Sequence, residues 1–192
     1  MAEIKSALEL ALEKAERYGR ASKEEMALSQ YQEQGRQLAV NYLKGEGDLA
    51  TDLQALPPQP QEAARAAARE VLLRNISLPR DGETDPRRDR ALEGLMLVAS
   101  NPKAMARLKE EVQQLLHNFL QVRSSAYQQL KGRFASTVGN MQRALEAQYG
   151  TKMRLEVEHL PQFQEEWRRF RGQLHDQFDP MLEDLKARMA NF

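Results

Sequence analysis

The residues best placed to do chemistry are a glutamate and a histidine three positions apart, Glu156 and His159. On a helix this Glu-x-x-His spacing puts a carboxylate and an imidazole on one face, as in di-iron helical bundles. Such a bundle needs the pair twice, and neither His117 nor His175 has a glutamate three positions before it. Glu156 and His159 are therefore weak metal-site candidates, and we expect them to be solvated, with no cofactor bound.

Other catalytic patterns are missing from the sequence. His175 and Asp179 are four positions apart, which fits a hydrogen bond across one helical turn better than a catalytic pair. No serine, histidine and acidic residue follow one another as they do in the known hydrolases. The segment Gly45-Glu46-Gly47 lacks the third glycine and the preceding strand of a phosphate-binding loop. We assign no catalytic residue and expect a protein that is not an enzyme.

The charge balance argues against nucleic-acid binding. The 192 residues include 28 basic and 28 acidic side chains, whereas proteins that bind phosphate backbones carry an excess of lysine and arginine. The absence of cysteine excludes disulfides and favours a reducing compartment. No secretory signal follows Met1, and the longest apolar stretch, Leu95 to Ala99, is far too short to span a membrane. We expect a cytoplasmic protein with no nucleic-acid partner.

Composition and periodicity predict an all-α fold, an elongated helical bundle with coiled-coil-like seams. Alanine, leucine, glutamate, glutamine and arginine dominate, and all of them favour helices. The first helix ends at Gly19, and Ser22 and Glu25 form a capping box that begins a second helix ending near Lys44. Residues 1–47 are therefore predicted to form an antiparallel helical hairpin. Its first helix has a heptad seam of Ile4, Leu8, Ala11, Ala15 and Tyr18.

Residues 48–100 are predicted to form a connector and two middle helices. Asp48 caps a short helix, and the prolines within residues 56–60 require an extended segment. A helix follows from about Pro60 to Ile76, and Gly35 of the preceding element would let a neighbouring helix approach closely. The next helix opens at Thr84-Asp85-Pro86 and carries four side chains inward, Leu92, Leu95, Met96 and Ala99.

Residues 101–192 contain the strongest pattern. Asn101 caps a long helix that begins at Pro102 and ends before Gly150, about 70 Å if it is continuous. Its apolar seam alternates spacings of three and four over Met105, Leu108, Val112, Leu115, Phe119, Val122 and Ala126. The phase then slips, as in a coiled-coil stutter, and the seam continues with Leu130, Phe134, Val138, Met141, Leu145 and Tyr149. Residues 151–160 are expected to be extended linker or distorted helix. An aromatic helix follows from Pro161, with a kink or a new cap at Asp179-Pro180.

The long helix has an unusual surface. Between Glu111 and Glu146 there is no acidic residue, and the 34 positions include only four charges, Arg123, Lys131, Arg133 and Arg143. A helix surrounded by water usually carries alternating charges, whereas a helix packed on several sides avoids them. Two interpretations stay open: the rest of the chain covers this helix, or it forms a self-association surface. For the second, we expect the interface at Gln121, Ser125, Gln128 and Gln129.

The first fourteen residues, Met1-Ala2-Glu3-Ile4-Lys5-Ser6-Ala7-Leu8-Glu9-Leu10-Ala11-Leu12-Glu13-Lys14, resemble the start of small bacterial helical proteins of uncharacterised function. The resemblance extends over about the first 45 residues. It implies a bacterial cytoplasmic setting and brings no catalytic motif with it.

These observations favour a non-enzymatic helical interaction or assembly protein that forms a homo-oligomer or binds another helical protein. One alternative is a metal- or small-molecule-binding bundle, which would implicate Glu156 and His159. The other is a peripheral membrane protein, because the N-terminal helix and the region from Met181 are amphipathic. The polar faces of both mix glutamate with lysine, whereas helices that lie on membranes favour lysine and arginine alone.

Overall fold

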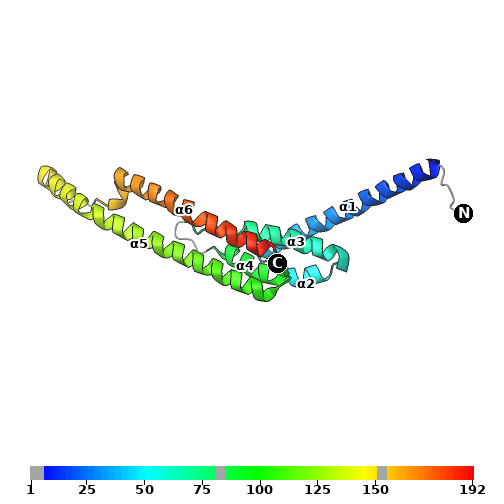
Figure 1. Cartoon of the computed structure of the whole chain (residues 1–192). Coiled ribbons are helices and arrows are strands. Elements are labelled where there is room, and N and C mark those ends of the chain that lie inside the picture. Colours follow the sequence, from blue (N-terminus) through cyan, green and yellow to red (C-terminus); the bar gives the residue numbers. More distant parts are fainter. Residues whose placement is uncertain (1–6, 81–84, 151–154) are drawn as a thin grey trace. The chain divides into compact units, whose positions relative to one another are not determined.

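The computed structural model describes residues 7–80, 85–150 and 155–192, and the side chains it describes begin at Glu25 and omit Gln59. In these ranges the chain is all-α, with six α-helices, one 3₁₀ turn and no strand (Figure 1). This confirms the predicted fold class. The chain divides into two compact units. One contains α1 to α4 and the start of α5, and the other contains the rest of α5, the 3₁₀ turn η1, α6 and the segment after Ile76.

Helix α1 runs from Ala7 to Lys44 without a break. The predicted hairpin over residues 1–47 is therefore wrong, because Gly19 and Ser22 lie inside one helix. A glycine in a helix interior costs only about 1 kcal/mol relative to alanine, and no proline stands nearby to stop the helix. The side chains of the heptad seam, from Ile4 to Tyr18, lie outside the described residues. Gly45, at φ 86°, ends the helix.

Helices α2 and α3 begin at residues that suit helix starts. The Asp48 carboxylate caps α2 (Leu49–Gln54) by accepting from the backbone N–H groups of Ala50 at 3.0 Å and Thr51 at 3.3 Å. Helix α3 (Pro58–Arg74) starts two residues earlier than expected. The first N–H groups of a helix have no helical acceptor, so Pro58 and Pro60 lose no hydrogen bond there. The prediction that residues 56–60 are wholly extended is corrected accordingly.

Close backbone packing holds this unit together. A Cβ atom added at Gly35 of α1 would lie 2.1 Å from the Ala64 carbonyl oxygen of α3, so the predicted close approach is confirmed. Helix α4 (Pro86–Val98) begins at Asp85, whose carboxylate accepts from the N–H of Arg87 at 3.0 Å. Apolar side chains of all four helices are buried in this unit: Ala39, Leu43, Leu49, Leu53, Ala64, Leu72, Leu92 and Leu95.

Helix α5 (Pro102–Tyr149) is continuous over 48 residues, as predicted. The Asn101 side chain accepts from the N–H of Ala104 at 3.1 Å, and Gly150 ends the helix at φ 66°. The seam is buried from Met105 to Phe119, but Val122 is 43% exposed and does not belong to it. The inward side steps from Phe119 to Arg123 and Tyr127, two spacings of four, so the stutter follows Phe119 and comes about two turns earlier than predicted.

Helix α6 (Pro161–Ala190) follows the 3₁₀ turn η1 (Val157–His159) and continues through Pro180. Residues 151–154 lie outside the described part. Of the two conformations expected for 151–160, extended backbone occurs at Glu156 and Leu160, and a distorted helical turn occurs at η1 between them. Helix α6 runs antiparallel to α5 (Figure 1), as three contacts in order along the pair show. Arg188 pairs with Glu111 at 2.9 Å, and the ring centroids of Phe178 and Phe119 and of Trp167 and Tyr127 are 5.4 and 5.0 Å apart.

Candidate functional site

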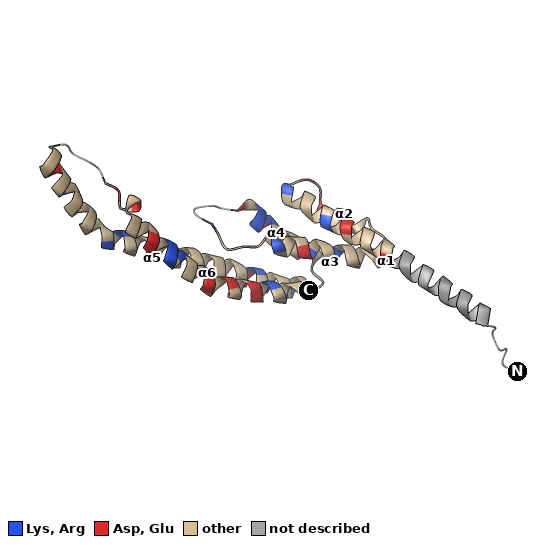
Figure 2. Cartoon of the chain, turned by 90° about the horizontal axis from the view of Figure 1, so that it is seen from above, with Lys and Arg blue, Asp and Glu red and all other residues tan. Residues whose placement is uncertain are grey.

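The outward face of α5 carries the residues that the sequence singled out. Gln121, Ser125, Gln128 and Gln129 are all exposed, and their spacings of four, seven and eight place them on one side of the helix. Within residues 112–145, twenty residues are exposed, and only Arg133 and Arg143 among them are charged. On α6 eight of eighteen exposed residues are charged, so the low charge is a property of α5 itself (Figure 2).

The same helix exposes apolar side chains. Leu120, Val122 and Met141 are each 43% exposed, although nearby positions of α5 are buried against α6. Exposed leucine, valine or methionine is ordinary when single. Here the three lie on a helix whose other exposed side chains are mainly amides and hydroxyls. We call the exposed residues of 112–145, apart from Arg133 and Arg143, the uncharged α5 face.

The metal candidates lie at η1. Glu156 precedes this turn and His159 ends it, and both side chains are exposed. The described residues contain no group of three or more histidine, aspartate and glutamate side chains arranged to hold a metal ion. The structure therefore adds no further ligand to the Glu156 and His159 pair in the part of the chain that it describes.

Glu158, between the two candidates, makes the contacts instead. Its carboxylate accepts from the Lys131 ammonium and, at 3.2 Å, from the Tyr127 hydroxyl, both on α5. The hydrogen bond from Lys131 lowers the pKa of Glu158, and the same bond raises the pKa of Lys131. Burial, followed by the Glu158 charge, raises the pKa of Tyr127. Through these contacts Glu158 holds η1 against α5. A hydrophobic cluster of Leu130, Val138, Val157 and Phe163 lies beside the network.

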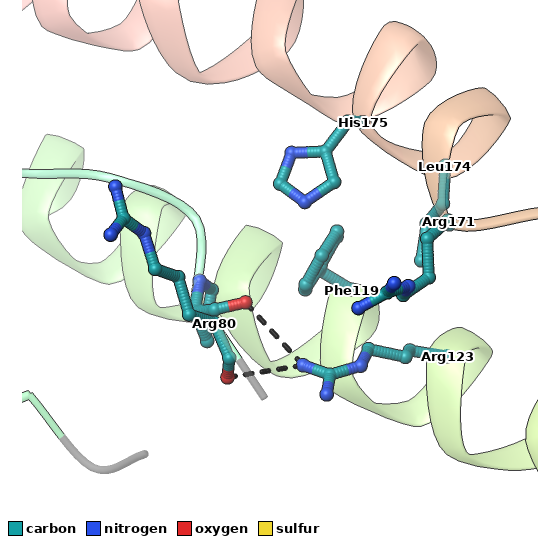
Figure 3. A pocket seen from close by; sticks show the side chains of 7 residues that line it. Arg80, Phe119, Arg123, Arg171, Leu174 and His175 are labelled. Carbon is teal, nitrogen blue, oxygen red and sulfur yellow. Dashed lines mark hydrogen bonds between the residues drawn. The ribbon is translucent and has the colours of Figure 1, made fainter. Parts of the chain in front are cut away.

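Sequence reasoning missed Arg123. Its guanidinium Nη1 donates to the carbonyl oxygens of Pro79 at 3.4 Å and Arg80 at 3.1 Å (Figure 3). The side chain thus ties the segment after Ile76 to α5. A signal was available, because Arg123 stands four residues after Phe119 and four before Tyr127 and therefore lies on the same side of the helix as these two aromatic residues.

The match to known proteins covers most of this architecture. A model described as Family of unknown function (DUF6657) matches residues 50–191. The chain belongs to this DUF6657 family. The expected kinship with small proteins of uncharacterised function is thus confirmed, although on residues 50–191 and not on the fourteen that suggested it. Curated proteins and solved structures give no match.

The DUF6657 match includes the uncharged α5 face, Arg123 and Glu158, and it leaves α1 outside. These candidate residues therefore lie in the part of the chain that matches the family model. Among the described residues of this DUF6657 member, no helix is long and apolar enough to cross a lipid bilayer.

Proposed function

We propose that this chain is a non-enzymatic helical assembly protein that associates with a second copy of itself through the uncharged α5 face. The observation that carries the proposal is the exposure of Gln121, Ser125, Gln128 and Gln129 on a face almost free of formal charge. The rest of the described chain leaves these side chains uncovered, so burial within the monomer does not account for their composition.

The desolvation energy of such a face favours association. Burying an amide or hydroxyl that finds a hydrogen-bond partner costs far less than burying a charge. Apolar side chains such as Leu120 and Val122 gain about 25 cal/mol for each Å² that they remove from water. The face between residues 113 and 144 is about 47 Å long at 1.5 Å per residue, enough for more than four heptads of helix contact.

The chemistry of the face suits a second copy of the same chain. Glutamine side chains donate and accept hydrogen bonds equally well, so two identical faces can pair about a two-fold axis. A partner with a charged face would leave its charges unpaired against α5, because Arg133 and Arg143 are the only formal charges exposed there.

The test is to place charge on this face. Gln121→Glu combined with Gln128→Glu puts two carboxylates seven residues apart, and the two-fold contact would bring four of them together. We expect the mass in solution, measured by gel filtration with light scattering, to fall to that of one 22.0 kDa chain. The control, Gln173→Glu with Gln177→Glu, adds the same charge to exposed positions of α6 and should leave the mass unchanged. An equal mass for the α5 variant and the unmodified protein would refute the proposal.

A further inference from the structure

The side of α5 that lies opposite α6 differs in side-chain size between its two halves. Phe119 and Tyr127 pack on α6, so the opposite side contains Gln121 and the residues three or four positions away from it in either direction. None of these residues is buried. The first half of this side carries large amides and the second half carries small residues: Gln114, Asn118 and Gln121, then Gly132, Ala135 and Gly139.

The two glycines are not explained by packing within the described chain. No described atom lies within 4 Å of a Cβ added at Gly132 or at Gly139. Both stand inside α5, and the glycines with positive φ are elsewhere, so neither is required by an unusual backbone conformation. Glycine weakens a helix interior relative to alanine. A second helix lying against α5 would use the space that both glycines leave open.

Charges at the two ends of this side define an orientation for such a helix. The order is positive then negative at both ends, with Arg107 before Glu110 and Arg143 before Glu146. The hydrogen bonds described for Arg143 go to neutral oxygens of its own helix, so its charge is not neutralised there. In a parallel pair each of these charges meets its own counterpart, which has the same sign.

An antiparallel pair brings opposite charges together. With the two-fold axis level with residues 126 and 127, Arg107 lies opposite Glu146 of a second copy. In the same placement Glu110 lies opposite Arg143 of the second copy, and the symmetry repeats both contacts. The charges are therefore complementary in one orientation and repulsive in the other.

The same placement also matches the sizes of the side chains. Each contact joins a larger amide to a small residue, whereas a parallel pair would stack amide on amide and leave gaps between glycines. The contacts are Gln114 with Gly139, Asn118 with Ala135, Gln121 with Gly132, and Gln128 with Ser125. One register thus satisfies charge and size along the whole side.

We propose that the partner is a second copy of this chain lying antiparallel on α5 in this register, an inference that rests on the proposed self-association. This side of α5 is its own complement when reversed, a property that an unrelated helix would not share. The small residues let the two backbones approach closely, and the amides of each copy fill the space beside the glycines of the other. The end charges are solvent-exposed, so they select the orientation and add little affinity.

Distances between spin labels on the assembled full chain test the register. The chain has no cysteine, and Gln113→Cys and Ser124→Cys each add one at an exposed position of α5. In the antiparallel register the two Gln113 sites are offset by about 40 Å along the helix axis, and the two Ser124 sites by only about 8 Å. A parallel pair gives no offset at either position. Pulsed electron resonance measures the first distance and spectral broadening detects the second.

Sedimentation of each labelled protein separates the two ways in which the inference can fail. A monomeric mass would overturn both the self-association and the register. A dimeric mass with short distances at both positions would overturn the antiparallel orientation and leave self-association standing. A dimer with long distances at both positions would overturn the register in the same way.

A charge exchange gives an independent test. Arg143→Glu turns two attractive contacts into repulsive ones and should raise the dissociation constant of the dimer about tenfold. Adding Glu110→Arg should restore the affinity, because the exchanged charges again meet opposite signs. Arg133→Glu reverses a charge that pairs with Glu166 of α6 at 3.4 Å and should have a smaller effect. Unchanged affinity in Arg143→Glu, or no recovery in the double variant, would overturn the inference.

Discussion

At Gly35 the absence of one carbon atom sets how closely two helices pack. An added Cβ would lie 2.1 Å from the Ala64 carbonyl oxygen and 2.7 Å from its carbonyl carbon, and both are backbone atoms that cannot rotate away. Any side chain at Gly35 must therefore push α1 away from α3. The buried alanines Ala64, Ala67 and Ala68 give α3 a narrow side that fits this approach.

Replacing Gly35 by alanine should lower the free energy of unfolding by about 1–3 kcal/mol or more, the usual cost of overpacking. The matched control is Gly172→Ala on α6, where no atom lies within 4 Å of the added Cβ. There the substitution should raise the free energy of unfolding by about 0.5–1 kcal/mol, because alanine favours helix. Urea denaturation followed by circular dichroism measures both. A Gly35→Ala protein as stable as the original would contradict the close contact.

Glu158 makes a prediction about pH. Its pKa is lowered in the folded state, so its contribution to stability is present above the ordinary glutamate pKa and is lost as pH falls through the folded value. The raised pKa of Lys131 sets the upper pH limit of this stabilisation. The contribution of Lys131 to stability is lost as pH rises through its pKa in the folded state. The contact therefore stabilises the fold across the whole neutral range.

Glu158→Gln should lower Tm at pH 7 by at most a few degrees, since the pair is solvent-accessible. The difference from the unmodified protein should shrink toward zero as the buffer is made acidic enough to protonate Glu158. Glu156→Gln, an exposed neighbour before the same turn, serves as the control and should change Tm less. Thermal scans at several pH values give the result, and a Tm difference that is constant down to strongly acidic pH would count against the Lys131 contact.

Single residues also show where sequence reasoning works. The Gly35 approach, the Asp48 and Asn101 caps and the Gly150 stop depend on local backbone chemistry, and the sequence predicts all of them. The inward position of Arg123 was not predicted. A seam rule assigns the core to apolar residues, whereas Arg123 is retained by two carbonyls more than forty positions away in the sequence.

At the scale of elements, α1 is the clearest departure from expectation. Gly19 and the capping-box residues Ser22 and Glu25 are the usual signals for a helix end and a helix start. Both signals are weak, because glycine is tolerated inside a helix and serine caps only where the backbone leaves the helical region. Proline-bounded starts were predicted more reliably, since Pro86, Pro102 and Pro161 all stand at first helical positions.

The continuity of α1 predicts a long distance between two labels. Because the chain has no cysteine, spin labels can be attached at Glu9→Cys and Gln34→Cys without background. One helix places them about 38 Å apart at 1.5 Å per residue, whereas a hairpin turning at Gly19 would bring them within about 10 Å. Pulsed electron resonance measures the distance. A short distance within the monomer would restore the hairpin.

At the scale of the whole molecule, helix content and the long α5 could be predicted because they follow from periodicity and from missing breakers. The division into two units could not be predicted, since it depends on contacts between segments far apart in the chain, such as Ser100 with Phe192. The low charge of residues 112–145 was visible in the sequence. Its exposure was not, because the sequence does not say which side of α5 the helix α6 covers.

Self-association through the uncharged α5 face is the central claim, and the solution mass of the unmodified chain tests it most directly. Sedimentation over a hundredfold range of protein concentration should show a species of at least two 22.0 kDa chains, dissociating on dilution to one. Association of uncharged faces should depend little on salt, since screening acts on charges. A single 22.0 kDa species at every concentration would contradict the claim.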